Sequence, residues 1–185
     1  MFVGERKYMP ETLLDHHYES SSLENVVAFS HRPRLREHRW TYGNITETAF
    51  RFARELGSRN IGQRDRVLIW AENCPEWVAA FYGILLCGAI AVPLDEHGSP
   101  EFAARVCGQT QPKLILNGRG VDVSALEIPS IPLEDLVQTI AHHPADPFRA
   151  GDVQPSDIVE IVFTSGTTAE PKGVVGRQKK ASKLR

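Results

Sequence analysis

The 185-residue sequence predicts an α/β fold in which helices cover a largely parallel sheet. Short apolar runs of strand length occur at residues 67–71, 89–94 and 113–117, and segments with helical spacing separate them. These runs do not alternate with polar residues, as expected for strands that are buried on both faces. The composition, 42% hydrophobic and 24% charged, is that of a chain with one well-formed core.

The first clear element is the β-prone segment R-W-T-Y, residues 39–42. Its Thr41 can cap a helix that follows. Helical spacing then places five apolar residues on one buried face. They are Ile45, Ala49, Phe52, Ala53 and Leu56. Pro75 occupies a position typical of the first turn of a second helix, which extends to about Cys87.

The rest of the chain continues this alternation. We expect a helix near residues 100–109, a short strand around Ile131 and another strand at 157–163. Residues 142–155 contain three prolines and are expected to form a surface connection. Residues 1–33 give no clear pattern. We therefore expect an α/β domain over residues 1–175 and a basic, disordered tail over 176–185.

Charge and cysteine content narrow the possible partners and compartments. The net charge is −2, which gives no electrostatic reason to expect nucleic acid as a partner. Five cations in the last ten residues could form a nucleic-acid or phosphoinositide patch, but a solvated terminus is the simpler interpretation. Three cysteines without a C-x-x-C pair fit a reducing compartment. No secretory signal is visible in the first residues, so we expect a cytoplasmic protein, soluble or peripheral to a membrane.

Residues 77–94 lack charges over 18 positions, the lower limit for a membrane-spanning helix. Their glycines and proline instead predict a buried helix followed by a strand, so no transmembrane segment is expected. The adjacent pairs His16–His17 and His142–His143 should point to different sides in a helix or strand, which predicts solvated histidines rather than metal ligands. Trp40, Trp70 and Trp77 lie in apolar patterns and are expected in the core.

The segment T-S-G-T-T-A-E-P-K-G, residues 164–173, carries the chemistry of the chain. It follows a predicted strand and places hydroxyls, glycine N–H groups and one lysine together, which are the components of a phosphate-binding loop. A polar turn between two strands would use the same residue types. A Walker A loop is disfavoured, because Pro171 and Gly173 replace its second glycine and its magnesium-binding hydroxyl.

The order T-S-G-T-T-x-x-P-K-G resembles the phosphate-binding loop of the adenylate-forming superfamily, which includes acyl-CoA synthetases and the adenylation domains of peptide synthetases. L-L-C-G-A-I-A-V-P-L-D, residues 85–95, is similar to a core segment of that family. R-W-T-Y, G-Q-R-D-R-V at 62–67 and N-C-P-E at 73–76 resemble its other landmarks. The resemblance spans about residues 36–175. One departure is Ala169, where the family more often has glycine.

The resemblance implies the N-terminal subdomain of an ATP- and Mg²⁺-dependent ligase, which converts a carboxylic acid such as a fatty acid to an acyl-adenylate and then to a thioester with CoA. It implies nucleotide-binding roles for seven residues: Thr164, Ser165, Gly166, Thr167, Thr168, Lys172 and Gly173. Thr164 is also the candidate contact to Mg²⁺. No catalytic residue is expected within this chain, since the family's adenine, acyl and thiol sites lie in later segments.

Three classes of function therefore remain open. The first is a ligase fragment that carries the phosphate loop and is inactive alone. The second is a non-catalytic binding or assembly module that retains the scaffold. The third is a nucleic-acid-binding protein that uses the basic tail. We also expect the fragment to self-associate through exposed apolar surface, because a subdomain of a larger enzyme exposes what the rest would cover.

Overall fold

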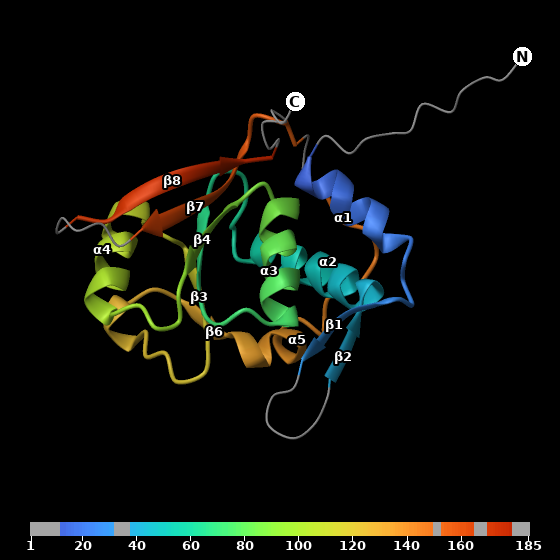
Figure 1. Ribbon diagram of the computed structural model, residues 1–185, viewed down its shortest axis with the longest axis horizontal. Helices are drawn as coiled ribbons and strands as arrows, with labels where there is room; N and C mark the ends of the chain where they lie inside the picture. The colour runs from blue at the N-terminus through green and yellow to red at the C-terminus, as the bar shows by residue number, and fades with distance from the viewer. Residues whose placement is uncertain (1–11, 32–37, 150–152, 165–169, 179–185) are drawn as a thin grey trace, which may run out of the picture.

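The computed structural model describes residues 12–31, 38–149, 153–164 and 170–178. Its main sheet has six strands in the order β6-β5-β3-β4-β7-β8 (Figure 1). Neighbouring strands from β6 to β7 are parallel, whereas β7 and β8 are antiparallel. The predicted largely parallel α/β sheet is therefore confirmed. The strands are β3 Arg66–Trp70, β4 Ile90–Leu94, β5 Leu114–Asn117, β6 Ser130–Pro132, β7 Ile158–Thr164 and β8 Lys172–Arg177.

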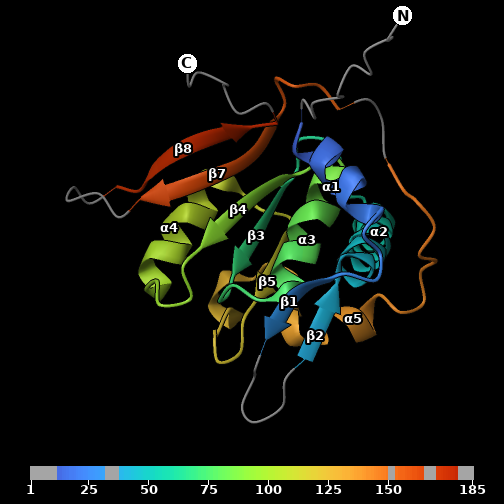
Figure 2. The ribbon, with the colours of Figure 1, turned by 45° about the vertical axis from the view of Figure 1, so that its right-hand side comes forward.

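Helices cover both faces of this sheet, as Figure 2 shows for α3 and α4 on opposite sides of β3 and β4. Helices α2 (Tyr42–Ser58) and α3 (Pro75–Leu86) pack on one face, and α4 (Pro100–Thr110) packs on the other. A further helix, α1 (Leu13–Ser21), packs against α2 and α3. The remaining helical segments are η1 Ser124–Leu126, η2 Leu133–Asp135 and α5 Leu136–Thr139.

The start of α2 follows from two side chains. Thr41 accepts a hydrogen bond from the Asn44 backbone N–H at 3.2 Å, and the Asn44 side chain accepts one from the Thr41 N–H at 3.0 Å. This reciprocal capping satisfies two N–H groups that a helix start otherwise leaves without partners. The five apolar residues predicted to face inward are all buried. The predicted cap and buried face are thus confirmed.

The core consists of two clusters separated by the sheet. Val67 and Ile69 of β3 point toward α2 and α3, whereas Leu68 and Trp70 point toward α4. This alternation arises because successive side chains of a strand lie on opposite faces. A continuous apolar run is therefore required wherever helices cover both faces. Of the three tryptophans, Trp70 is buried as expected, while Trp40 and Trp77 are half-buried.

Helix α1 and strands β1 and β8 were not predicted from the sequence. Helix α1 and β1 (Val27–His31) lie in the region that gave no clear pattern, whereas β2 (His38–Thr41), which pairs with β1, matches the predicted β-prone segment 39–42 to within one residue. Strand β8 continues through Gly176 and Arg177, so the boundary expected after residue 175 lies within a strand. Gln178 is buried beyond its end. The later tail residues, 179–185, lie outside the described residues.

Both histidine predictions were wrong in part. His17 is buried, 2% exposed, and its ring stacks on Tyr82 with centroids 4.3 Å apart. His142 and His143 converge on the carboxylate of Glu55, because they lie in a turn after α5, where adjacent side chains need not diverge.

The remaining features concern the cysteines and the uncharged stretch at residues 77–94. Cys74, Cys87 and Cys107 are free thiols, and the last two are buried. Within the described ranges, no helix combines the length and the apolar character needed to cross a bilayer.

Candidate functional site

The predicted phosphate loop connects β7 to β8 and thus lies at the end of an antiparallel hairpin. Thr164, the last residue of β7, is paired in register with Lys172, the first residue of β8. Paired residues of an antiparallel ladder point to the same face of the sheet. The strand pairing therefore places one hydroxyl and one ammonium group side by side at the base of the loop.

Three of the seven predicted nucleotide-binding residues belong to the described structure. Thr164, Lys172 and Gly173 are all exposed, and the hairpin brings them together. The other four, Ser165, Gly166, Thr167 and Thr168, lie outside the described residues, as does Ala169. Glu170 is also exposed, whereas Pro171 is buried.

The base of the loop is attached to α4. The side-chain amide of Gln109, near the end of that helix, donates to the carbonyl of Pro171 at 3.4 Å and lies 3.4 Å from a carboxylate oxygen of Glu170. Burial of Pro171 adds apolar contact at the same point. The position of Lys172 relative to the sheet is thus determined by one buried proline and by the end of a helix.

Gly173 is required by close packing rather than by its backbone angles. It lies opposite Phe163 in the hairpin. A Cβ at this position would lie 3.0 Å from Ile161 Cγ2 and 3.2 Å from the Phe163 ring. Phe163 itself packs against the cluster on the α4 face, so it cannot withdraw without opening that cluster. The glycine of the P-K-G sequence therefore allows the hairpin to close tightly over the sheet.

The described part of the loop is open to solvent and carries one exposed anion and one exposed cation, Glu170 and Lys172. Lys172 contributes a cation and Thr164 a hydroxyl, and neither side chain is covered by another element. An ammonium group and hydroxyls on an exposed turn can donate charge-assisted hydrogen bonds to phosphate oxygens. The same face of the hairpin also carries Val162 and Val174, a cross-strand pair that is 39% and 61% exposed.

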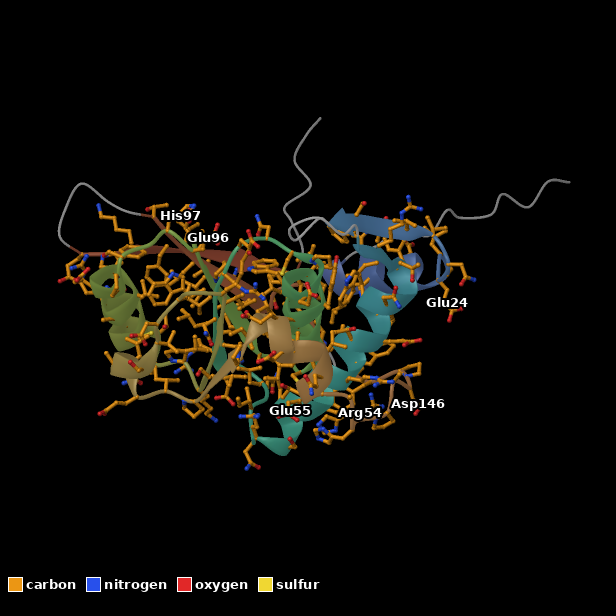
Figure 3. All side chains as sticks on the ribbon, turned by 90° about the horizontal axis from the view of Figure 1, so that it is seen from below. Glu24, Arg54, Glu55, Glu96, His97 and Asp146 are labelled. Atoms are coloured by element: carbon orange, nitrogen blue, oxygen red, sulfur yellow. The ribbon has the colours of Figure 1, made fainter. Side chains whose placement is uncertain are left out.

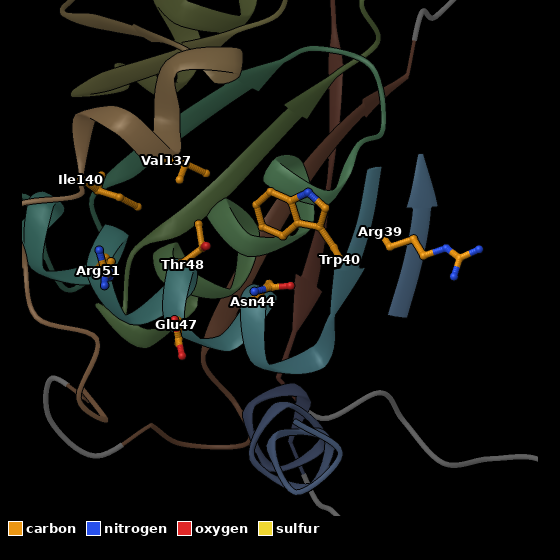
Figure 4. A pocket seen from close by; sticks show the side chains of 8 residues that line it. All are labelled: Arg39, Trp40, Asn44, Glu47, Thr48, Arg51, Val137 and Ile140. Carbon is orange, nitrogen blue, oxygen red and sulfur yellow. The ribbon is translucent and has the colours of Figure 1, made fainter. Parts of the chain in front are cut away.

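A pocket of about 350 Å³ lies elsewhere, between β2, α2 and α5 (Figure 4). Its walls combine two arginines and a glutamate with a half-buried tryptophan and aliphatic side chains. Its lining residues are Arg39, Trp40, Asn44, Glu47, Thr48, Arg51, Val137 and Ile140. None of these comes from β7 or β8, so this pocket is separate from the predicted loop.

A cluster of polar side chains joins Glu55 of α2 to His142 and His143, two histidines that the sequence predicts to be solvated. The Nε2 atom of His143 lies 2.8 Å from Glu55 Oε2, and that of His142 lies 3.7 Å from the same oxygen. Residues 88 positions apart form the shorter contact, so no local sequence pattern could have indicated it.

Comparisons with known proteins agree on one family. The family model for AMP-binding enzymes matches residues 22–183. 4-Coumarate--CoA ligase 1 from Solanum tuberosum is 28% identical over 188 residues, which cover 91% of this chain and 33% of the ligase. Surfactin synthase subunit 2 from Bacillus subtilis is 32% identical over 140 residues, which cover 74% of this chain and 4% of that protein. The chain thus spans about a third of the length of the CoA ligases it matches.

Two solved structures illustrate the fold that this chain shares. The fatty acyl-adenylate ligase from L. pneumophila, solved with acyl adenylate and pyrophosphate, has a TM-score of 0.79 at 23% identity, covering 94% of this chain and 32% of that one. The N-terminal subdomain of Klebsiella oxytoca NpsA has a TM-score of 0.74 at 20% identity, covering 91% of this chain and 41% of that one. The fold, the loop sequence and the extent of the family match together show that this chain belongs to the family of AMP-binding enzymes.

Proposed function

We propose that this chain supplies the triphosphate-binding part of an ATP-dependent ligase that activates a carboxylate as an acyl-adenylate and then transfers the acyl group to CoA. One observation carries the proposal. Thr164 and Lys172 are paired and exposed at the base of a T-S-G-T-T-x-x-P-K-G hairpin, in a chain that belongs to the AMP-binding family. The CoA ligases among its relatives support the ligase class.

In this proposal the loop holds the β- and γ-phosphates of ATP while the carboxylate attacks the α-phosphorus. Lys172 neutralises charge on the departing pyrophosphate, and the hydroxyl of Thr164 donates to a phosphate oxygen. Residues 165–168 add hydroxyl and backbone N–H donors, and Gly173 allows the strands to approach closely. The group that carries the charge is exposed, so binding triphosphate requires no rearrangement of the core.

Mg²⁺ is compatible with this arrangement, because the exposed hydroxyl oxygen of Thr164 is the kind of hard ligand that Mg²⁺ accepts together with phosphate oxygens. Thr164 is the residue of this chain that would hold the ion. When bound, the ion would neutralise phosphate charge.

We further propose that the 185-residue chain alone binds ATP no more tightly than about millimolar and has no ligase turnover. Each charge-assisted hydrogen bond contributes about 1.5–3 kcal/mol. Loss of the ligand's translational freedom and ordering of the loop offset several kcal/mol of that. A net of about −4 kcal/mol corresponds to a millimolar dissociation constant.

The test is ATP binding by the 185-residue chain, measured by phosphorus NMR line broadening or calorimetry. Lys172→Ala should abolish the binding, and Lys172→Arg should retain most of it because the charge is kept. Arg105→Ala is the matched control, since it removes an exposed cation from α4, the helix that contacts the base of the loop. Equal ATP binding by wild type and Lys172→Ala would reject the phosphate role.

A fatty acid or an aromatic acid is the carboxylate that the relatives suggest, since they include a fatty acyl-adenylate ligase and 4-coumarate--CoA ligases. Pyrophosphate release in the presence of acids of both classes tests whether this chain is active alone. We expect no release from the 185-residue chain alone. Release that disappears in Lys172→Ala would show that this chain is itself an enzyme.

The exposed valines of the hairpin support a proposal of self-association. Val162, Val174 and Val175 are 39%, 61% and 46% exposed, and β8 is the outermost strand of the sheet at that edge. An outermost strand offers unpaired backbone N–H and C=O groups to a second copy of this chain. Sedimentation at micromolar concentration should show a dimer or larger species, and Val174→Lys should shift it toward monomer. A wild-type monomer would overturn this proposal.

A further inference from the structure

Three side chains that can bind a metal ion converge where α2 meets the turn after α5. Glu55 comes from the last turns of α2, and His142 and His143 follow α5 directly. Their candidate ligand atoms, one carboxylate oxygen and two imidazole nitrogens, all lie within 4.8 Å of one another. Two imidazoles and one carboxylate are a ligand set that zinc accepts in proteins, with a further position left for water.

The outer hydrogen bonds prepare two of these groups as ligands. The Nδ1 atom of His142 lies 3.0 Å from the carbonyl oxygen of Thr139, which can only accept, so Nδ1 carries the proton and Nε2 has the lone pair. Arg59 Nε donates to Glu55 Oε1 at 2.7 Å, which leaves Oε2 turned toward the histidines. Metal-binding histidines usually donate their other ring N–H to such a carbonyl or carboxylate.

Burial orders the three groups from the inside outward. The Glu55 side chain is only 7% exposed, while those of His143 and His142 are 15% and 65% exposed. Arg59 Nε contacts one carboxylate oxygen of Glu55, and His143 Nε2 contacts the other. The carboxylate therefore lies at the inner end of a cluster that opens to solvent through His142.

We propose that Glu55, His142 and His143 form a binding site for a divalent cation of the zinc class. Metal–nitrogen and metal–oxygen bonds of zinc sites place tetrahedral ligand atoms about 3.3 Å apart. The two observed separations from Glu55 Oε2, 2.8 Å and 3.7 Å, lie on either side of this value. In the hydrogen-bonded arrangement His143 Nε2 carries the ring proton. When the ion binds, this proton moves through solvent to Nδ1 of the same ring, so that Nε2 offers its lone pair to the ion and His143 stays a neutral imidazole.

The bound ion would clamp the connection between α5 and β7 to α2. Two arginines of α2 already hold this segment: Arg51 donates to the carbonyl of Ala141 at 3.2 Å, and Arg54 donates to that of Asp146 at 2.8 Å. Figure 3 shows Arg54 and Asp146 beside each other, with Glu55 on the same side of the molecule. The site thus completes a row of contacts along one helix, which predicts a structural rather than a catalytic ion.

The experiment titrates Zn²⁺, and Co²⁺ as its coloured analogue, into the 185-residue chain without a polyhistidine tag. We expect one equivalent to bind, with a visible Co²⁺ spectrum typical of four or five ligands and a rise in the melting temperature. His142→Gln should weaken binding by at least about tenfold. This variant is the decisive one, since the side chain is largely exposed and its loss should not unfold the chain. His143→Gln should have the same effect.

His97→Gln is the matched control. His97 is an exposed histidine beside a carboxylate, 3.5 Å from Glu96, at a different end of the molecule from Glu55 (Figure 3). The His97→Gln variant should bind Zn²⁺ with the affinity of the wild type. Hydrogen exchange of residues 139–148 should slow when the ion binds. Absence of binding at 100 µM, or equal affinity in wild type and His142→Gln, would overturn the site and leave a histidine–carboxylate hydrogen bond. Unchanged exchange would overturn the clamp.

Discussion

Strands β3 and β7 both have apolar sequences, but β3 and the β7–β8 hairpin have very different surroundings. The run V-L-I-W-A at residues 67–71 and the run I-V-E-I-V-F at 158–163 both read as apolar strands. Val67, Leu68 and Ile69 are completely buried, with helices on both faces of their sheet. On the hairpin, in contrast, Val162 is 39% and Val174 is 61% exposed.

The difference shows that an apolar run specifies a strand but does not specify whether other elements bury its faces. β3 pairs with β4 and β5 along nearly its whole length, whereas β7 has one registered parallel pair with β4, Ala91 with Glu160. The hairpin is held by Val159, which lies in the core cluster on the α2 and α3 face, by Phe163, which packs against the α4-face cluster, and by the buried Pro171. The end of the hairpin that carries the exposed Val162 and Val174 also presents Lys172 and Thr164 to solvent. One sheet thus contains strands buried on both faces and a partly exposed hairpin.

The largest effect should come from truncation in the covered strand. Leu68→Ala removes a side chain with no exposed surface and leaves a cavity between the sheet and α4, so we expect a loss of about 3–4 kcal/mol in the free energy of unfolding. Val162→Ala on the hairpin should lose less than about 1 kcal/mol. Urea unfolding of both variants measures the difference. Similar losses would show that the hairpin is as tightly packed as β3.

Acid should destabilise the helix-covered part of the fold around His17 rather than the β7–β8 hairpin. Burial lowers the pKa of His17 from 6.5 to about 4, so the folded chain keeps this ring neutral. Between these pH values the unfolded state binds the proton more tightly, and stability that is complete above pH 6.5 falls as the pH approaches 4. The loss should reach at most about 3 kcal/mol.

Urea unfolding at pH 7 and pH 4.5 checks this for three chains. His17→Phe keeps an aromatic ring on Tyr82 and should show a smaller loss between the two pH values than wild type. Val174→Ala, on the hairpin, should retain the wild-type loss. If His17→Phe is as acid-sensitive as wild type, another group controls the pH dependence.

The contact between α2 and α3 offers a sharper test of close packing. A Cβ at Gly83 would lie 2.8 Å from Phe52 Cδ1 and 3.0 Å from the carbonyl oxygen of Ala49. Gly83→Ala should therefore lose about 1–3 kcal/mol of stability. Gly57→Ala is its counterpart near the end of α2, where a Cβ meets nothing within 4 Å. It should gain about 0.5–1 kcal/mol because alanine favours helix. Thermal unfolding of the two variants should give shifts of opposite sign.

The smallest effect on stability is expected at the proposed binding residue itself. Lys172 is exposed at the base of the loop, so Lys172→Ala should change the free energy of unfolding by less than about 0.5 kcal/mol. The same variant is expected to lose ATP binding. A large loss of stability, measured in urea, would show that Lys172 supports the hairpin and would make its effect on binding ambiguous.

Prediction from sequence succeeded where local chemistry decides. The cap at Thr41, the buried face of α2 and the proline that opens α3 all follow from residues within a few positions of each other. Strand β8 was missed because K-G-V-V-G-R has two glycines and two charges, a weak strand pattern. It forms because β7 provides an edge and because side chains of β7 lie over its glycines, Phe163 at Gly173 and Glu160 at Gly176.

The sequence by itself determined the class of the fold, the order of its main elements and the location of the predicted phosphate-binding motif, since these depend on periodicity, caps and residue type along the chain. Tertiary structure alone decided which apolar strands are covered. It also paired Thr164 with Lys172 across the hairpin and brought His142 and His143 to Glu55. The physical reason is that burial, cross-strand pairing and ligand convergence depend on distances between segments far apart in sequence, about which local patterns carry no information.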